Sequence, residues 1–293
     1  MKNAILVWVL RSFAWLPLRV SRAFGRTVGR LIYALKLTPV RVSRINLQLC
    51  YPQLSTAEIE QRCRQRMLQL GQAFFETPRV WSQPPQWLES KILSVEGLDL
   101  LQAALDDDRG MLLIVPHQGN WEVIGLWVAT QTQMTSLYEP PKIPQLGKWI
   151  KSSRERSGAT LVPTDVRGVA ALIKALKRGD TSGILPDQQP GPQGGVMVPF
   201  MGVQARTMTL VTNLINRAGC RALLATALRE PGGWRLHFLP ASDALYSEDQ
   251  LEAVTALNED VARIVALAPD QYQWEYKRFR VQDDGRDIYA KNA

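Results

Sequence analysis

Residues 115–123, VPHQGNWEV, bring a histidine and a glutamate into one short segment. His117 is one of only two histidines in the chain, and Glu122 follows it after four intervening residues. A carboxylate that holds one ring nitrogen of an imidazole fixes the tautomer and raises the basicity of the other nitrogen. The pair therefore predicts a general base that takes a proton from a hydroxyl, with Glu122 orienting the ring of His117.

The position of His117 in the predicted fold strengthens this hypothesis. An isolated histidine and glutamate at this spacing is also compatible with a histidine that only hydrogen-bonds a neighbouring loop. Here, however, His117 follows the apolar run MLLIV at 111–115, which is typical of a buried strand. Gly119 then allows a tight turn, Asn120 can cap the next helix, and Glu122 would lie in its first turn.

The rest of the chain predicts one α/β domain in which strands alternate with helices. This alternation favours a mostly parallel, twisted sheet covered by helices, with ligands outside the carboxyl ends of the strands. The predicted strands are 91–95, 111–115, 134–138, 160–163, 181–185, 221–228 and 234–239. The predicted helices are 55–81, 97–106, 119–130, 143–157, 167–178, 205–218 and 247–267, and the first begins with a capping box in STAE.

Several other chemistries lack their sequence signatures. The chain contains no GxSxG elbow, no GxxxxGK[ST] loop, no HExxH and no GxGxxG. Two histidines and three cysteines without CxxC spacing argue against a metal site or a disulfide framework. We therefore expect no polyhistidine metal site.

Positive charge is concentrated at the N-terminus. Residues 1–57 contain nine Lys or Arg and no acidic residue, whereas the other 236 residues carry 26 basic and 27 acidic side chains. A nucleic-acid-binding protein would carry basic residues on its folded body, so nucleic acid is not an expected partner.

Residues 1–40 predict an N-terminal membrane-associated helix that precedes a catalytic domain at 41–293. The first apolar run, 4–10, is too short to span a bilayer, and Pro17 should kink the helix. On a helical wheel the basic residues share about a third of the circumference and the apolar residues lie opposite, as in helices that lie on anionic membranes. The alternative is a helix docked on the protein's own core with a solvated basic face.

Six segments in consistent order resemble the bacterial lipid A biosynthesis (late, or secondary) acyltransferases, a branch of the lysophospholipid acyltransferase superfamily with its H-x4-D/E motif. They are NLQLCYPQLS, HQGNWE, RERSG, LPDQQPG, VPFMG and QYQWEYKRFR, and they cover nearly the whole chain. The resemblance implies a glycerol-phosphate-acyltransferase-like α/β fold. Two departures are Gln118, where the family often has an aromatic residue, and Met201 in the segment that is more often PFFG.

The resemblance also implies an activity and its partners. An acyl chain would pass from acyl carrier protein to a hydroxyl of a lipid A precursor, at the cytoplasmic face of the bacterial inner membrane. His117 carries over as the base and Glu122 as its orienting partner. No covalent intermediate is needed because a thioester is already activated. The resemblance implies neither a metal nor a bound cofactor.

Further residues carry over as candidate substrate-binding groups. Arg154 matches the family's arginine block and suits a sugar phosphate or the carrier's phosphopantetheine, and Arg156 is its neighbouring candidate. Asp187 resembles the family's functional aspartate and should share an edge of the sheet with His117. Each also has a plain structural alternative, as a helix-end arginine or as a turn residue before Pro190.

Three more positions complete the predicted site. Gly119 and Asn120 should shape the turn, leave room for the thioester and offer backbone N–H groups to an oxyanion. Arg206, in VPFMGVQARTMT, should lie near the mouth of an acyl tunnel. Two alternatives to lipid A acylation stay open: acylation of another membrane lipid (a mannosylated phosphoinositide, an ornithine lipid or a lysophospholipid), and non-catalytic binding of lipid or carrier.

Overall fold

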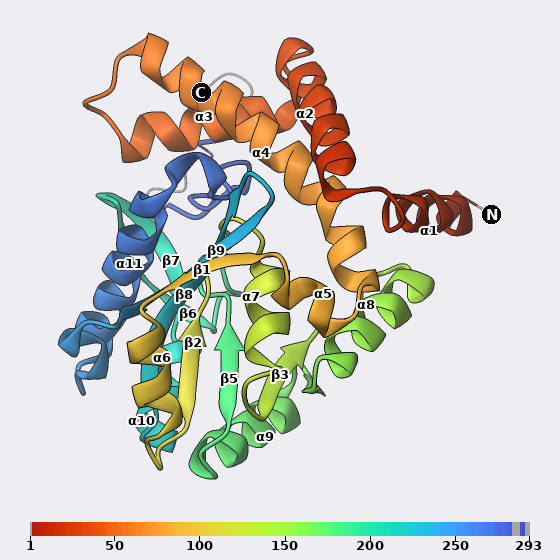
Figure 1. The fold of residues 1–293 in the computed structure, drawn as a ribbon. Coiled ribbons are helices and arrows are strands. Elements are labelled where there is room, and N and C mark those ends of the chain that lie inside the picture. Colours follow the sequence, from red (N-terminus) through yellow and green to blue (C-terminus); the bar gives the residue numbers. More distant parts are fainter. Residues whose placement is uncertain (1, 283–287, 291–293) are drawn as a thin grey trace.

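A seven-stranded sheet forms the centre of the molecule in the computed structural model, which describes residues 2–282 and 288–290. The strand order is β1-β9-β8-β2-β5-β3-β4, and every adjacent pair is parallel except the β8–β9 hairpin. The expected mostly parallel sheet is therefore present (Figure 1). Its strands are β1 (Ile92–Glu96), β2 (Met111–Ile114), β3 (Met134–Tyr138), β4 (Ala159–Pro163), β5 (Thr181–Ile184), β8 (Arg221–Glu230) and β9 (Gly233–Pro240).

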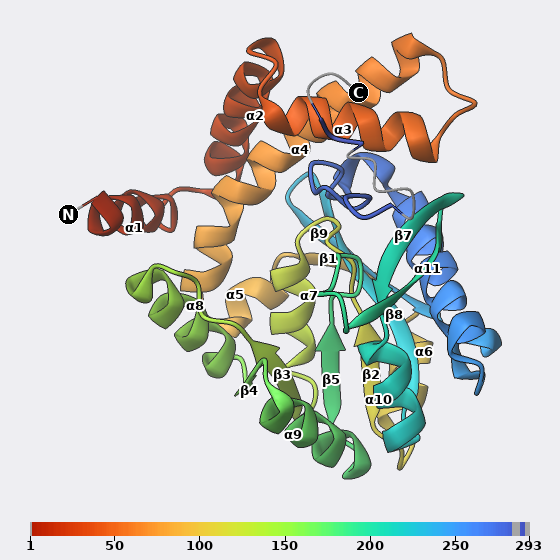
Figure 2. The same cartoon turned by 180° about the vertical axis from the view of Figure 1, so that it is seen from behind.

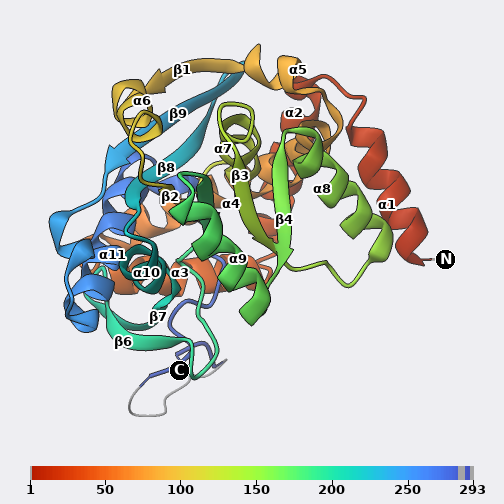
Figure 3. The same ribbon diagram turned by 90° about the horizontal axis from the view of Figure 1, so that it is seen from below.

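Helices cover both faces of this sheet (Figure 3). The side chains of β2 alternate between the two faces, as a strand requires. Leu112 and Ile114 pack into the core beneath α9 (Val166–Lys177), α10 (Leu210–Ala218) and α11 (Gln250–Leu267). Met111 and Leu113 pack into the core beneath α6 (Leu98–Leu105) and α7 (Trp121–Val128).

A separate layer of helices lies across the carboxyl-terminal end of the parallel strands (Figure 1). It contains α1 (Lys2–Phe13), α2 (Leu18–Ala34), α3 (Thr38–Cys50) and the long α4 (Thr56–Ser82). The expected capping box begins α4, because Ser55 and Glu58 exchange both hydrogen bonds. The short α5 (Pro85–Glu89) returns the chain to the sheet, and α8 (Pro144–Arg156) lies beside α1 and α4.

Glycines allow α2 to lie directly against α4. A Cβ atom added to Gly25 would lie 2.4 Å from the carbonyl oxygen of Gly71, and one added to Gly29 would lie 2.2 Å from that of Met67. Gly25 and Gly29, which contact α4, lie on the surface of α2 between its basic arc and its apolar arc. Basic side chains therefore flank the contact on one side, while large apolar side chains stay exposed on the other: Val20, Phe24, Leu31 and Leu35.

Pro17 separates two helices instead of kinking one, which corrects the sequence expectation. Helix α1 ends at Phe13, and Pro17 is the N-cap residue of α2. Figure 2 shows α1 extending away from the sheet. Among the described residues, no helix combines the length and apolar character needed to cross a bilayer.

A small antiparallel hairpin was missed by the sequence prediction. Strands β6 (Gly195–Phe200) and β7 (Val203–Met208) pair outside the main sheet and pack beside α11 (Figure 2). The helix predicted at 205–218 is therefore wrong over its first residues, and α10 begins only at Leu210. Met201 and Gly202 form the tight turn with positive φ values of 49° and 83°, which a hairpin can use and a helix cannot.

Candidate active site

Parallel pairing of β2 with β5 brings His117 and Asp187 to one edge of the sheet. Ile114 pairs with Ile184, and His117 and Asp187 each lie three residues beyond these partners. Because β2 and β5 run parallel, the two segments that follow these buried strands leave the sheet side by side at its carboxyl end. The sequence expectation that these two residues share an edge is confirmed.

The carboxylate that holds the ring of His117 belongs to Asp187. His117 Nδ1 lies 2.8 Å from Asp187 Oδ1, and the backbone N–H of His117 donates to Oδ2 at 2.8 Å. The predicted pairing of His117 with Glu122 is wrong in this structure. Glu122 follows the turn into α7, and its carboxylate is directed to α8 instead.

The environment of Asp187 keeps it ionised. Burial raises the pKa of its carboxyl, but the nearby imidazole and the hydrogen bonds from His117 outweigh burial, so the net shift of the pKa is downward. Burial raises the pKa of the neighbouring Tyr272 well above its usual value, and the charge of Asp187 adds to that shift. An anionic Asp187 accepts the Nδ1 proton of His117, which leaves Nε2 as the basic nitrogen.

A glutamine contacts the basic nitrogen of His117. Gln188 Nε2 lies 3.3 Å from His117 Nε2 and donates to Gln273 Oε1 at 3.0 Å. The ring of Trp121 also meets the imidazole edge-on, with 4.9 Å between centroids. Gln188 lies in the LPDQQPG segment, and no role was predicted for it from the sequence. Any group that bonds to His117 Nε2 has to displace this amide.

The turn after His117 is tightly fixed by backbone contacts. Gly119 has φ = +61°, and a Cβ atom there would lie 2.0 Å from the carbonyl oxygen of Ala227, so only glycine fits. The N–H of Gly119 donates to Gln271 O, and that of Asn120 donates to Ala227 O. These two groups are thus already bonded, and the expectation that they serve an oxyanion is wrong for this conformation.

Asn120 occupies the N-cap position of α7, but its side chain makes no capping hydrogen bond. Its Nδ2 instead donates to Glu76 Oε1 at 3.0 Å. Glu76 is fully buried and pairs with Arg22 at 2.6 Å and with Arg229 at 2.7 Å. Burial raises the pKa of Glu76, but the two guanidinium groups outweigh it and the net shift is downward. This cluster, which the sequence analysis missed, fixes the turn from behind.

Glu122 and Arg154 form a two-pronged ion pair. Arg154 Nη2 lies 2.6 Å from Glu122 Oε1, and Nε lies 3.2 Å from Oε2. The guanidinium also lies 5.6 Å from the centroid of the Tyr138 ring. Burial lowers the pKa of Arg154, but Glu122 outweighs it and the net shift is upward. Arg154 thus stays charged, and within 2–282 and 288–290 its Nη1 makes no hydrogen bond, so it can contact another anion.

Two apolar cavities adjoin at Trp121 and Glu122, and Arg154 lines the smaller of them. The larger, of about 300 Å³, lies between α4, α7 and α8, and its walls include Ala73, Phe74, Gly119, Trp121 and Glu122. A smaller one, of about 90 Å³, runs beneath α7 towards the sheet and shares the last two of these residues. The His117 side chain is 14 % exposed beside the same turn. We call the larger space the acyl cavity.

The remaining predicted site residues lie further away. Arg156 is exposed and donates to the carbonyl of Trp81, and it borders neither apolar cavity. Arg206 lies on β7, where its carbonyl accepts a hydrogen bond from Arg278. It also borders neither cavity, and its expected position at the mouth of an acyl tunnel stays a prediction.

The described part of the chain contains no arrangement of side chains that suits metal binding or cysteine catalysis. There, at 2–282 and 288–290, no group of three or more His, Cys, Asp or Glu could hold a metal ion. Cys50, Cys63 and Cys220 are free and buried. Burial raises the pKa of the first two thiols to about 12 and that of the third to about 11, so none is an activated nucleophile.

A histidine held by a carboxylate, beside an apolar cavity in an α/β fold, is an arrangement suited to general-base chemistry on a substrate with a hydrocarbon part. Residues 2–281 match the family model described as bacterial lipid A biosynthesis acyltransferase, and the chain belongs to that family.

Curated relatives match over nearly the same span. The lipid A biosynthesis palmitoleoyltransferase of Escherichia coli K12 is 29% identical over 96% of this chain and 92% of its own length. The lipid A biosynthesis lauroyltransferase of the same organism is 26% identical over 96% and 93%, respectively. The crystal structure of the 1-acyl-sn-glycerophosphate (LPA) acyltransferase from Thermotoga maritima aligns with a TM-score of 0.40 at 16% identity, covering 82% of this chain and 98% of that one.

Proposed function

We propose that this protein transfers a fatty acyl chain from acyl carrier protein to a hydroxyl group of a lipid A precursor. Family membership supports the reaction type, and the acceptor is inferred from what the relatives are named for. One structural observation carries the mechanism. His117 is held by Asp187 at 2.8 Å on the loop that borders the acyl cavity.

The reaction follows from the tautomer that Asp187 imposes. With its Nδ1 proton donated to Asp187, His117 takes the proton of the acceptor hydroxyl at Nε2 once Gln188 has moved aside. The hydroxyl oxygen then bonds to the thioester carbon and the carbon–sulfur bond breaks. The imidazolium returns its proton to the departing thiolate, so an ester and a free thiol are formed and no charge is left over.

The acyl cavity gives the donor chain a place to bind. Its walls are mostly apolar, and it extends from the loop after His117 along α4. Burying a methylene group contributes about 0.8 kcal/mol, so an acyl chain that fills this space is held firmly. Holding both substrates beside His117 makes the attack effectively unimolecular, which lowers the barrier further.

Glu122 is proposed as a positioning residue that acts through Arg154. Glu122 borders both cavities, and its carboxylate fixes the guanidinium at the wall of the smaller one, where Nη1 can contact a phosphate of the donor or acceptor. Asp187 takes over the role of holding the base. His117, Glu122, Arg154 and Asp187 therefore all remain in the proposed site. Asp187 pairs with His117, and Glu122 pairs with Arg154.

The N-terminal helices are proposed to rest on the cytoplasmic surface of the inner membrane, where the lipid substrate resides. Trp8 and Trp15 are 73 % and 85 % exposed, and tryptophan favours the membrane interface. Residues 1–57 carry only positive charges, which anionic lipids attract. In this proposal residues 1–40 form the membrane-associating part and 41–293 the catalytic domain.

The test is an acylation reaction with purified full-length protein. A tetra-acylated lipid A precursor is incubated with acyl carrier proteins that bear chains of different lengths, and the products are read by mass spectrometry. We expect the precursor to gain one acyl chain with wild type and none with His117→Ala. A folded wild-type protein that acylates another lipid but not this precursor would refute the proposed acceptor. Near-normal turnover by His117→Ala would refute the mechanism.

A further inference from the structure

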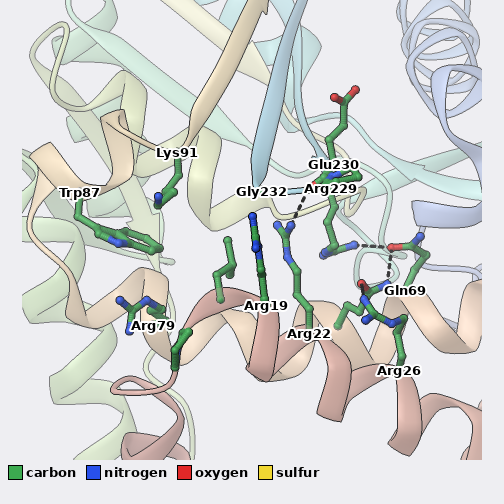
Figure 4. Close-up of a pocket in the computed structure, with 14 residues that line it drawn as sticks. Arg19, Arg22, Arg26, Gln69, Arg79, Trp87, Lys91, Arg229, Glu230 and Gly232 are labelled. Atoms are coloured by element: carbon green, nitrogen blue, oxygen red, sulfur yellow. Dashed lines mark hydrogen bonds between the residues drawn. The ribbon is translucent and has the colours of Figure 1, made fainter.

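A third and larger cavity, of about 830 Å³, lies on the opposite side of α4 from the acyl cavity. Gln69, Gln72 and Arg79 face it, whereas Leu70, Ala73 and Thr77 face the acyl cavity, so α4 is the wall between the two spaces. Figure 4 shows cationic side chains converging on this space from α2, from α4 and from the edge of the sheet. We call it the basic pocket, and its cations are Arg19, Arg22, Arg26, Arg79, Lys91 and Arg229.

The basic pocket holds more positive than negative charge. Glu230 is the one acidic residue among its lining, and its carboxylate pairs with Arg235 at 2.8 Å while pointing away from the arginines in Figure 4. Glu76 forms ion pairs with both Arg22 and Arg229. The other four cations of the pocket have no carboxylate partner within 2–282 and 288–290.

The uncompensated cations retain unused hydrogen-bonding capacity. Among the described residues, Arg79 donates only through Nη1, to the carbonyls of Ala14 and Leu16, and its buried Nε has no partner there. Arg26 donates from Nη1 to the amide oxygen of Gln72. Burial also lowers the pKa of Arg79, which reflects the cost of keeping its charge without a counter-ion. A bound anion would offset that cost.

Phosphate is the anion that this donor set fits. Guanidinium groups bind phosphate oxygens with paired, charge-assisted hydrogen bonds, and several of them around one space accommodate more than one phosphate oxygen. The pocket is also wide enough for a head group and not only for a small ion. Its walls include the apolar residues Pro17, Leu18 and Trp87, which suits a ligand with an organic part.

The position of the basic pocket beside the α1–α2 junction indicates that the phosphate belongs to a lipid. Pro17 and Leu18 line the pocket, and Trp15, two residues before Pro17 in the α1–α2 connection, is 85 % exposed. An amphiphile with its phosphate among the arginines therefore has the apolar side chains of the α1–α2 junction available for its hydrocarbon part. A soluble phosphate would use the cations and leave this apolar edge unused.

We propose that the basic pocket binds the phosphate of an anionic lipid head group, at a site separated from the His117 cleft by α4. The proposal rests on the charges and lining of the pocket and does not depend on the acyl-transfer reaction. Because Arg22 and Arg229 also hold Glu76 behind the catalytic turn, the test uses the outer cations instead.

The experiment measures binding of short-chain lipids below their micelle-forming concentration to the full-length protein by calorimetry. The probes are dihexanoyl phosphatidic acid, dihexanoyl phosphatidylcholine and inorganic phosphate. The test variant is Arg19→Gln/Arg26→Gln. The matched control is Arg30→Gln/Lys36→Gln, which removes the same charge from the same segment at residues that do not line the pocket. Thermal unfolding confirms that both variants are folded.

We expect phosphatidic acid to bind tighter than either other probe, and the test variant to weaken that binding at least tenfold. The control should change it less than threefold. This size follows because a hydrogen bond to a charged group contributes enough to change a dissociation constant about tenfold.

Equal losses in the test and control variants would overturn the pocket, since only overall charge would matter. Phosphate binding as tightly as phosphatidic acid would overturn the lipid assignment. Loss of acyl carrier protein binding in the test variant, with lipid binding unchanged, would identify a protein partner and also overturn it.

Discussion

The Nδ1 atom of His117 lies 2.8 Å from Oδ1 of Asp187, although 70 residues separate the two along the chain. They meet because β2 and β5 are neighbouring parallel strands in register and each residue follows its strand by the same number of positions. The glutamate of the local HQGNWE segment holds Arg154 instead. His117 and Arg154 therefore each have their own carboxylate, and substitutions can distinguish the two pairs.

Asp187→Asn should lower the rate of acyl transfer about 10²- to 10⁴-fold, the range that a well-held general base contributes. The amide cannot stabilise the imidazolium, and it no longer enforces the tautomer with Nε2 free. Single-turnover kinetics measure this loss, with thermal unfolding as the check on the fold. Asp99→Asn, at an exposed position on α6, is the control and should leave the rate unchanged. Near-normal turnover by Asp187→Asn would show that Asp187 does not support the base.

Glu122→Ala and Arg154→Ala should show strongly non-additive effects on kcat/KM. Each single change leaves the other member of a partly buried ion pair without its partner, so the double variant should be little worse than either single variant. We expect a coupling of about 1–3 kcal/mol in a double-mutant cycle. Independent, additive losses would mean that Glu122 does not act through Arg154.

Glu76→Gln should cost about 3–5 kcal/mol of stability at pH 7, because Arg22 and Arg229 lose their shared buried counter-charge. The pKa of Glu76 is lowered in the folded state, so its stabilising effect is complete above its unfolded pKa of about 4.3 and is lost as the pH falls through the folded value. Chemical denaturation at several pH values should show that the free energy of unfolding of Glu76→Gln lies below that of wild type by a constant amount between about pH 7 and pH 5. A gap that already closes in that range would contradict the ionised cluster.

Ala73→Leu should shift the acyl donor preference towards shorter chains. Ala73 lines the acyl cavity, and a larger side chain there takes up space that a long chain would fill. Competition between acyl carrier proteins bearing different chains, analysed by mass spectrometry, gives the preference directly. Ala103→Leu adds the same volume at an exposed position on α6 and serves as the control. An unchanged preference in Ala73→Leu would place the chain elsewhere.

Trp8→Gln/Trp15→Gln should weaken flotation with anionic vesicles about tenfold or more, because two exposed aromatic rings are lost from α1 and the α1–α2 connection. Val166→Gln removes an apolar side chain that is also 85 % exposed, at the start of α9, and should leave flotation as in wild type. Full flotation by the double tryptophan variant would argue against membrane contact through these helices.

Several local features could be predicted from the sequence because they depend on neighbours in the chain. The alternation of apolar runs and helical patterns located the main strands, and the capping box of Ser55 and Glu58 located the start of α4. The order of motifs indicated the family, which the family model confirms. The β6–β7 hairpin was missed because its short strands adjoin a helical pattern, and the turn at Met201 and Gly202 gave no strong signal.

The sequence alone determined that His117 follows a buried strand and that Gly119 allows the turn after it, since both depend on residues within a few positions. Only the tertiary structure decided that Asp187 and not Glu122 holds the imidazole, and that Glu76 binds Arg22, Arg229 and Asn120 behind the turn. A carboxylate pairs with whichever cation or N–H group the strand register and helix packing bring within about 3 Å. Those contacts join residues far apart in the chain, so sequence spacing does not reveal them.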